Sequence, residues 1–255
     1  MIGSPLRYQD CPIWQKIYLA WFGIPHLSTH IKAMAISAWL PACSPCSVLD
    51  AGCGSGLFSF WLAQRMPSSK IIGVDSSEED IALARQMLGP NRLVNLSFER
   101  ADLRCLPYVE SFDFILCLDV LEHIREDEQA LGCLRGALKP GGQMIVHVPR
   151  RHQEQFRAFG SWDAWGNHGH ARDEYTREEI QSRLLNAGFK IERFRTTFRP
   201  AQAPFWEIAT KLRQLAPHLS WLFFPLLFVG SRIGGLFESE KGNGFLLLCS
   251  KEKAL

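Results

Sequence analysis

The stretch "VLDAGCGSGLFSFWLA", residues 48–63, places an acid inside an apolar run and then three glycines at alternate positions. Val48 and Leu49 end a short apolar segment, and apolar residues resume at helical spacing from Leu57 onward. The pattern predicts a strand, a tight turn and a helix. Glycine lets backbone N–H groups approach a ligand, and a helix N-terminus favours electron-rich groups. A nucleotide-binding turn is the functional prediction, and a glycine-rich turn without a ligand is the structural alternative.

The spacing of the glycines narrows the choice of nucleotide. Gly52, Gly54 and Gly56 follow Asp50 as G-x-G-x-G, whereas the dinucleotide-binding fingerprint G-x-G-x-x-G needs a glycine where this chain has Leu57. This mismatch argues against a nicotinamide cofactor and leaves other adenosine-containing ligands open.

Two further acids follow the next predicted strands. The segment "KIIGVDSSEED", residues 70–80, predicts a strand that ends in Asp75, with Ser76 and Ser77 as candidate caps of the following helix. A carboxylate at that place can accept hydrogen bonds from both hydroxyls of a ribose. Asp102 follows the third predicted strand and could hold an adenine amino group, with a loop-capping acid as its alternative.

Taken in order, these motifs resemble those of the class I S-adenosylmethionine-dependent methyltransferases, and most of all the branch with the ubiquinone-pathway O-methyltransferases. The resemblance rests on the glycine turn, Asp75, Ala101–Leu103, "FDFILCLDVLEHI" at 112–124 and "LKPGGQMIVHVP" at 138–149. It covers roughly residues 45–150, and "GHARDEYTREEIQSRLLNAGF" at 169–189 is similar to the same branch.

The resemblance implies an α/β fold, with a Rossmann-like, mostly parallel seven-stranded sheet, helices on both faces and the last strand inserted antiparallel. It implies S-adenosyl-L-methionine as cofactor and S-adenosyl-L-homocysteine as product. Asp75 would hold the ribose, Asp102 with Leu103 the adenine, and the remaining positions mainly the methionine portion. The residues expected to contact the cofactor are Asp50, Gly52, Gly54, Gly56, Asp75, Ser76, Asp102, Leu103, Cys117 and Leu118.

Four histidines are candidates for a general base. A sulfonium methyl is already electrophilic, so the protein has to align a nucleophile and, for a hydroxyl, take its proton. His147 ends a strand that should open into the cleft, and a strand-end histidine held by the backbone is its alternative. His168 and His170 lie in a polar, aromatic stretch that we expect to contact substrate.

His123 is the remaining candidate. It follows the fourth strand, and Asp119, Glu122 and His123 stand at positions i, i+3 and i+4, which share one face of a helix. Relatives suggest a divalent metal at such a cluster, but capping and salt bridges are the preferred interpretation here, and no metal ligand is assigned.

Length and charge fit one such domain. A chain of 255 residues suits a single α/β domain, and a net charge of +2 argues against a nucleic-acid partner. The eight cysteines are scattered among apolar segments and no signal peptide is evident, which predicts reduced thiols in a cytoplasmic protein. We expect an N-terminal helical cap over 1–42 and a methyltransferase domain over 43–255, whose inserts at 150–176 and 199–243 lie over the cleft.

The second insert bears on the acceptor. "WLFFPLLFVG", residues 221–230, is apolar, is broken by Pro225 and is too short to cross a bilayer. It predicts either a buried lid or a peripheral membrane contact through 205–237. Both favour a small, hydrophobic acceptor that is aromatic, isoprenoid or lipid-like, and the resemblance implies that such a metabolite is most simply methylated on oxygen. The alternatives are a non-catalytic S-adenosylmethionine-binding regulatory or scaffold protein and a nicotinamide oxidoreductase. The sequence does not indicate an oligomeric state.

Overall fold

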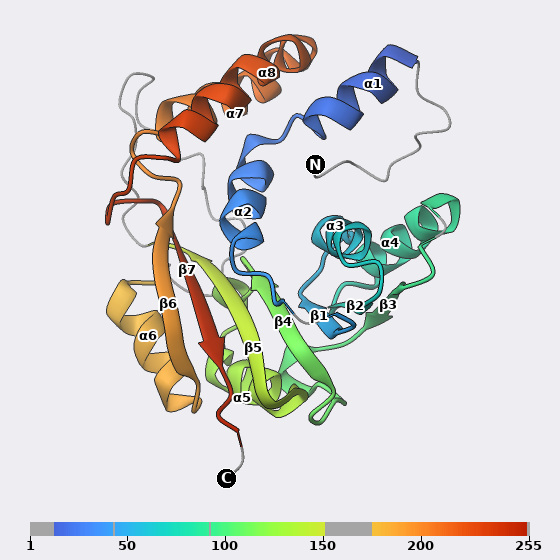
Figure 1. The fold of residues 1–255 in the computed structure, drawn as a ribbon, viewed down its shortest axis with the longest axis vertical. Coiled ribbons are helices and arrows are strands. Elements are labelled where there is room, and N and C mark those ends of the chain that lie inside the picture. The colour runs from blue at the N-terminus through green and yellow to red at the C-terminus, as the bar shows by residue number, and fades with distance from the viewer. Residues whose placement is uncertain (1–12, 43, 92, 151–174, 254–255) are drawn as a thin grey trace.

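The computed structural model describes residues 13–42, 44–91, 93–150 and 175–253. Its centre is a seven-stranded sheet in the order β3-β2-β1-β4-β5-β7-β6 (Figure 1). The strands are β1 (Ser47–Ala51), β2 (Lys70–Asp75), β3 (Leu96–Arg100), β4 (Phe112–Leu118), β5 (Leu138–Pro149), β6 (Lys190–Thr197) and β7 (Gly244–Ser250).

The sheet confirms the fold that the motifs imply. Strands β1 to β5 pair in parallel, and β7 enters antiparallel between β5 and β6. The central strands are apolar on both faces because helices cover both faces. Within β1, for example, Val48 belongs to the core on one side of the sheet and Leu49 to the core on the other.

Helices form two layers over the sheet. One core cluster joins the sheet to α3 and α4, through residues such as Phe60 and Ile81, and the other joins it to α5 and α6, through Leu134 and Leu184. The helices are α1 (Ile13–Phe22), α2 (Leu27–Ser37), α3 (Leu57–Arg65), α4 (Glu78–Asn91), α5 (Asp127–Ala137), α6 (Arg177–Asn186), α7 (Ala203–Leu215) and α8 (Pro217–Gly234), with short 3-10 turns at Leu103–Cys105 and Leu121–His123.

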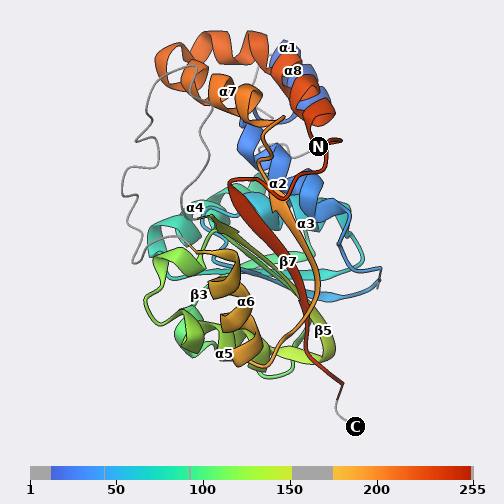
Figure 2. The same cartoon turned by 90° about the vertical axis from the view of Figure 1, so that its left-hand side faces the viewer.

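Four helices form a further layer beyond the sheet, which we call the helical cap: α1, α2, α7 and α8. Helix α2 also reaches the core of the sheet through Ala33 and Ile36. Both views show it at one end of the molecule (Figures 1 and 2). A third apolar cluster holds it together, with Leu27 and Ile31 of α2 packed with Trp206 of α7 and Phe224 of α8. The N-terminal segment and the second insert therefore build one structure. Arg150 and Tyr175 bridge the two ends of the first insert, whose residues 151–174 lie outside the described residues.

Two expectations need correction. Pro225 does not break the apolar segment, because α8 continues through it. Cys46 is disulfide-bonded, whereas the scattering of cysteines along the chain predicted reduced thiols; spacing in sequence does not report which sulfurs meet in the fold. Within the described residues, no helix combines the length and apolar character needed to cross a membrane.

Helix α8 tolerates its internal proline because another helix supplies the missing donor. Pro225 has no N–H, so the carbonyl of Trp221, four residues earlier, loses its partner within the helix. The hydroxyl of Tyr18, on α1, donates to that carbonyl at 2.8 Å, and the Tyr18 and Trp221 rings pack with their centroids 5.1 Å apart. The contact satisfies α8 and fixes α1 against it.

This arrangement predicts a specific coupling between Tyr18 and Pro225. Tyr18→Phe leaves the Trp221 carbonyl without a donor and should lower the free energy of unfolding by about 1–2 kcal/mol. In a Pro225→Ala background the restored N–H serves that carbonyl, so the same substitution should cost clearly less. Urea denaturation of the four proteins gives the coupling energy. Equal losses in both backgrounds would contradict the assignment.

Candidate functional site

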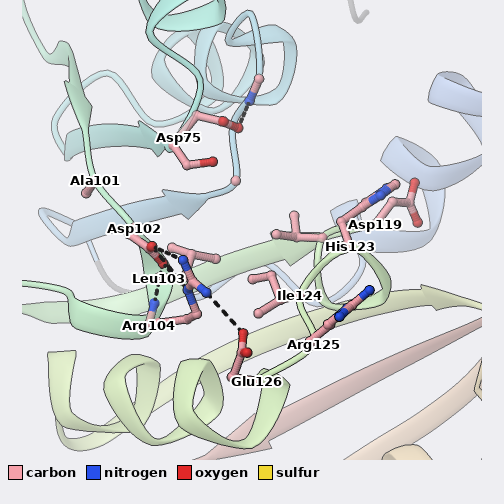
Figure 3. A pocket seen from close by; sticks show the side chains of 14 residues that line it. Asp75, Ala101, Asp102, Leu103, Arg104, Asp119, His123, Ile124, Arg125 and Glu126 are labelled. Carbon is pink, nitrogen blue, oxygen red and sulfur yellow. Dashed lines mark hydrogen bonds and ion pairs between the residues drawn. The ribbon is translucent and has the colours of Figure 1, made fainter. Parts of the chain in front are cut away.

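A cavity of about 640 Å³ opens at the carboxyl ends of the first four strands (Figure 3). Strand β1 lies between β2 and β4, so the strand order reverses here, which is where open α/β sheets bind ligands. The volume lies in the range of small-molecule sites, about 300–1,000 Å³. The wall comes from segments after four successive strands: Gly52, Gly54, Asp75, Ser76, Ala101 to Arg104, Asp119, Val120 and His123 to Glu126.

The glycine turn shapes one side of the cavity. Gly54 has a positive φ of 50°, and a Cβ there would meet no atom within 4 Å, so its backbone is open to a ligand. Gly56 has a different role. A Cβ on it would lie 2.5 Å from the ring of Phe98, and Gly56 does not line the cavity. Gly56 is therefore required for packing of the turn against β3.

Asp75 is held at the cavity wall by two backbone donors. Its Oδ2 accepts from the N–H of Gly54 at 2.8 Å, and its Oδ1 accepts from the N–H of Ser77 at 2.9 Å. Each oxygen retains a further lone pair for a ligand. Ser76 lies beside it in the same wall. The predicted ribose-binding carboxylate is thus fixed in orientation before any ligand arrives.

Asp102 lies across the cavity from Asp75 and already has partners (Figure 3). Arg104 donates to it from its backbone N–H at 2.9 Å and from its guanidinium at 2.7 Å, and the same guanidinium pairs with Glu126 at 3.0 Å. Hydrogen bonds from Arg104 hold the pKa of Asp102 below its usual value. Sequence reasoning missed Arg104, and its position two residues after the acid was the available signal.

Asp50 does not line the cavity. It is 3% exposed, and the hydroxyl of Ser59, on α3, donates to it at 2.5 Å. Burial raises the pKa of Asp50 to about 6. Cys117 and Leu118 are also absent from the cavity wall, and Cys117 is fully buried in β4. The structure therefore places these three behind the cavity rather than in its wall.

Asp119 lines the cavity, although the sequence did not predict that it contacts the cofactor. It has a positive φ of 53°, which is uncommon for a residue other than glycine. Lys32, from the helical cap, donates to it, and so does the Nδ1 of His147. Burial alone would raise the pKa of Asp119, but Lys32 and His147 hold that pKa well below its usual range. The ion pair joins α2 to the carboxyl end of β4.

His147 lies deeper than the sequence indicated. Its side chain is 2% exposed, its Nε2 shares a hydrogen bond with the Thr197 hydroxyl at 2.8 Å, and it is not part of the cavity wall. The expectation that it opens into the cleft therefore needs correction, because Asp119 and Thr197 engage both ring nitrogens and Phe198 packs against the ring. His123 does line the cavity. His168 and His170 lie outside the described residues.

The cluster around His123 does not form a metal site. Asp119 is committed to Lys32 and His147, and Glu122 is 1% exposed. Across the described residues, no group of three or more histidine, cysteine, aspartate or glutamate side chains could hold a metal ion.

Comparison with known proteins identifies the family. A family model described as "Methyltransferase domain" matches residues 43–192, which is more than half of the chain. The chain belongs to the methyltransferase domain family. This match confirms the family resemblance of the motifs, and it extends past β5 through α6 to the beginning of β6.

Individual relatives agree with this family. Trans-aconitate 2-methyltransferase from Deinococcus radiodurans is 35% identical over 120 residues, which cover 47% of this chain and 44% of that protein. Ubiquinone biosynthesis O-methyltransferase from Azoarcus sp. (strain BH72) is 32% identical over 113 residues, 44% of this chain and 46% of that protein. The chain thus matches less than half the length of these relatives.

One solved structure shares the fold of this chain, and the match extends over nearly the whole length of that structure. The crystal structure of an S-adenosylmethionine-dependent methyltransferase from Mesorhizobium loti superimposes with a TM-score of 0.60 at 23% identity, covering 88% of this chain and 99% of that one. At this level of identity the likeness concerns the fold.

The burial of Asp50 predicts a pH dependence of stability. Its pKa is about 6 in the folded protein, against about 3.9 in an unfolded chain. The folded state therefore binds the proton more tightly, and the stability that Asp50 contributes is lost as the pH rises from about 4 through about 6. Because Asn cannot ionise, the free energy of unfolding of the wild type minus that of Asp50→Asn should fall by roughly 2–3 kcal/mol over this window. Urea denaturation across the pH range measures it, and a constant difference would contradict it.

Proposed function

We propose that the chain transfers a methyl group from S-adenosyl-L-methionine to a small apolar acceptor, most simply to a hydroxyl oxygen. Family membership supports the reaction class, and a single observation supports the site: the cavity at the reversal of strand order carries a pre-oriented carboxylate, Asp75, beside an open glycine backbone, Gly54. Arrangements of this kind suit the ribose and the neighbouring chain of an adenosyl ligand.

In the proposed binding mode, the ribose, the adenine and the methionine portion of the cofactor each contact a different part of the cavity wall. Asp75 accepts from the ribose hydroxyls, and Ala101–Leu103 lie beside the adenine. For Asp102 to accept from the adenine amino group it has to share its carboxylate with Arg104, which already occupies both oxygens. We propose that Gly52 and Gly54 receive the methionine portion through their backbone carbonyls, since their N–H groups already donate to Val74 and Asp75. Asp119 lines the same cavity, and it has to share its carboxylate with Lys32 and His147 to accept from a ligand ammonium. Asp50 then acts from behind the turn, through Ser59, as a positioning residue.

The acceptor is proposed to enter from the side of the helical cap. The cap lies beyond the carboxyl ends of β5 and β6, where the chain leaves and re-enters the sheet (Figure 1). Its internal cluster is aromatic and aliphatic, with Phe198, Trp206 and Phe228 among its members. We propose that an acceptor that enters beside a cap of this composition is aromatic, isoprenoid or lipid-like rather than strongly charged.

The cofactor, when bound, supplies an activated methyl group, so the protein contributes alignment, exclusion of water and removal of a proton. We propose His123 as the base, because its side chain is in the cavity wall. We propose His147 as a positioning residue that orients Asp119, since both of its ring nitrogens are engaged. His168 and His170 stay predictions for substrate contact.

The proposal predicts labelled methyl transfer. The full chain, incubated with S-adenosylmethionine labelled on its methyl group and a panel of phenols, catechols and prenylated phenols, should label at least one acceptor, detected in the organic extract. Asp75→Ala should weaken binding of S-adenosylhomocysteine by roughly 10- to 100-fold, because hydrogen bonds to a charged group are lost. Isothermal titration calorimetry measures this affinity.

Controls separate the alternatives. Glu79→Ala, which removes an exposed carboxylate from α4, should leave the affinity unchanged. His123→Ala should reduce transfer by about 10²–10⁴-fold with the affinity intact. Tight binding of a nicotinamide dinucleotide in place of S-adenosylhomocysteine would contradict the proposal. Tight binding of S-adenosylhomocysteine without transfer to any acceptor would instead favour a regulatory or scaffold protein.

A further inference from the structure

Helix α8 presents an apolar stripe to the outside of the molecule. Leu222, Leu226, Val229 and Ile233 are 50–70% exposed, and their spacing of four, three and four residues places them on one helical face. The opposite face is buried in the helical cap through residues such as Phe224. A helix that is apolar on both its inner and outer faces is unusual at a protein surface, and a contiguous exposed patch of this kind marks an interaction site.

The surroundings of the stripe extend the apolar surface. Phe223 flanks it on α8, and Leu236 and Phe237 follow the end of the helix, all of them exposed. At the other end, Leu215 closes α7 and is 82% exposed. Trp21 is exposed on α1, which packs against α8 through Tyr18. Three of these flanking residues, Trp21, Phe223 and Phe237, carry aromatic rings of the kind found where a protein meets the headgroup region of a bilayer.

The charges around the stripe have one sign. Over residues 13–42 and 199–237, which contain the helical cap, the sole acid is Glu207, and it is 5% exposed. Arg213 and Arg232 are exposed on α7 and α8. The next acids along the chain, Glu238 and Glu240, are exposed after Phe237 and line a separate cavity together with arginines such as Arg177 and Arg195. The outer surface of the cap is therefore apolar, cationic and free of exposed carboxylates over residues 13–42 and 199–237.

We propose that this surface docks onto an anionic lipid bilayer, with α8 lying in the plane of the interface. The stripe enters the boundary between headgroups and acyl chains, and Arg213 and Arg232 contact lipid phosphates. The helix lies on the membrane and does not span it, in agreement with the absence of a spanning helix among the described residues. The inference does not depend on the proposed methyl transfer.

The charges favour a lipid surface over a second copy of the chain. In a two-fold dimer the same patch faces itself, so the arginines of each copy would find no carboxylate in the other copy's patch to pair with. An anionic bilayer provides the opposite charge together with an apolar phase. The position of the cap also suits a flat partner, since it forms one end of the molecule in both views (Figures 1 and 2).

Vesicle sedimentation tests the proposal on the full chain. It should bind vesicles of phosphatidylcholine mixed with phosphatidylglycerol more tightly than vesicles of phosphatidylcholine alone, and added salt should weaken the binding. The double substitution Leu222→Ser with Leu226→Ser should lower the partition coefficient by roughly tenfold or more. Arg213→Gln with Arg232→Gln should remove most of the preference for phosphatidylglycerol.

A matched control uses exposed apolar residues at the amino ends of two strands, away from the helical cap. Val94 and Val109 are exposed in the loops that precede β3 and β4, so replacing both with Ser should leave binding unchanged. Thermal melts and S-adenosylhomocysteine affinity, measured on every variant, separate loss of docking from misfolding and from failure of the cofactor site. The proposal is overturned if the wild type does not bind anionic vesicles, if both serine pairs reduce binding equally, or if the leucine pair converts a solution dimer into a monomer.

Discussion

The turn between β1 and α3 is held in place by the end of β2, and the candidate site depends on this contact. The carbonyl of Val74 accepts from the N–H groups of Gly52 at 2.8 Å and Cys53 at 2.9 Å, and the Asp75 carboxylate accepts from Gly54 at 2.8 Å. Three consecutive amides of the turn are thus fixed by two consecutive residues of the neighbouring strand. The bond from Gly54 also orients Asp75. The contacts that fix the shape of the turn therefore also orient the carboxylate that we propose to bind the ribose.

A second set of contacts connects this edge of the sheet to the helical cap. Lys32, Asp119, His147 and Thr197 form a continuous chain of polar contacts from α2 across the ends of β4, β5 and β6. Asp119 also lines the cavity, so a movement of α2 would change the position of a side chain in the wall of the proposed cofactor site. The cap in turn is stabilised by the bond from Tyr18 to α8. The proposed entry of the acceptor and the proposed docking of α8 therefore concern one connected set of helices.

Much of the fold and part of the site could be predicted from the sequence, for identifiable reasons. Strand ends followed by Gly54, Asp75 and Asp102 are local features, and local spacing reports them well. Contacts between distant residues are not visible in spacing: Lys32 and Asp119 are 87 residues apart, and Tyr18 compensates Pro225 through a bond across 203 residues. The sequence predicted that Asp50 contacts the cofactor, but its side chain does not line the cavity. Side chains alternate along a strand, so Asp50 points to the same side as Val48, toward α3. The sequence left a buried lid and a peripheral membrane contact both open for this segment, because an apolar run does not say which side of a helix is covered.

The central claim is that the carboxyl ends of β1 to β3 hold an adenosyl ligand, with Asp75 on its ribose. The most direct measurement is a crystal structure of the protein with S-adenosylhomocysteine at saturating concentration. The account predicts electron density in the 640 Å³ cavity, with the ribose hydroxyls within hydrogen-bond distance of Asp75 and the adenine beside Ala101–Leu103. An empty cavity in such a crystal, or the ligand bound elsewhere, would contradict it.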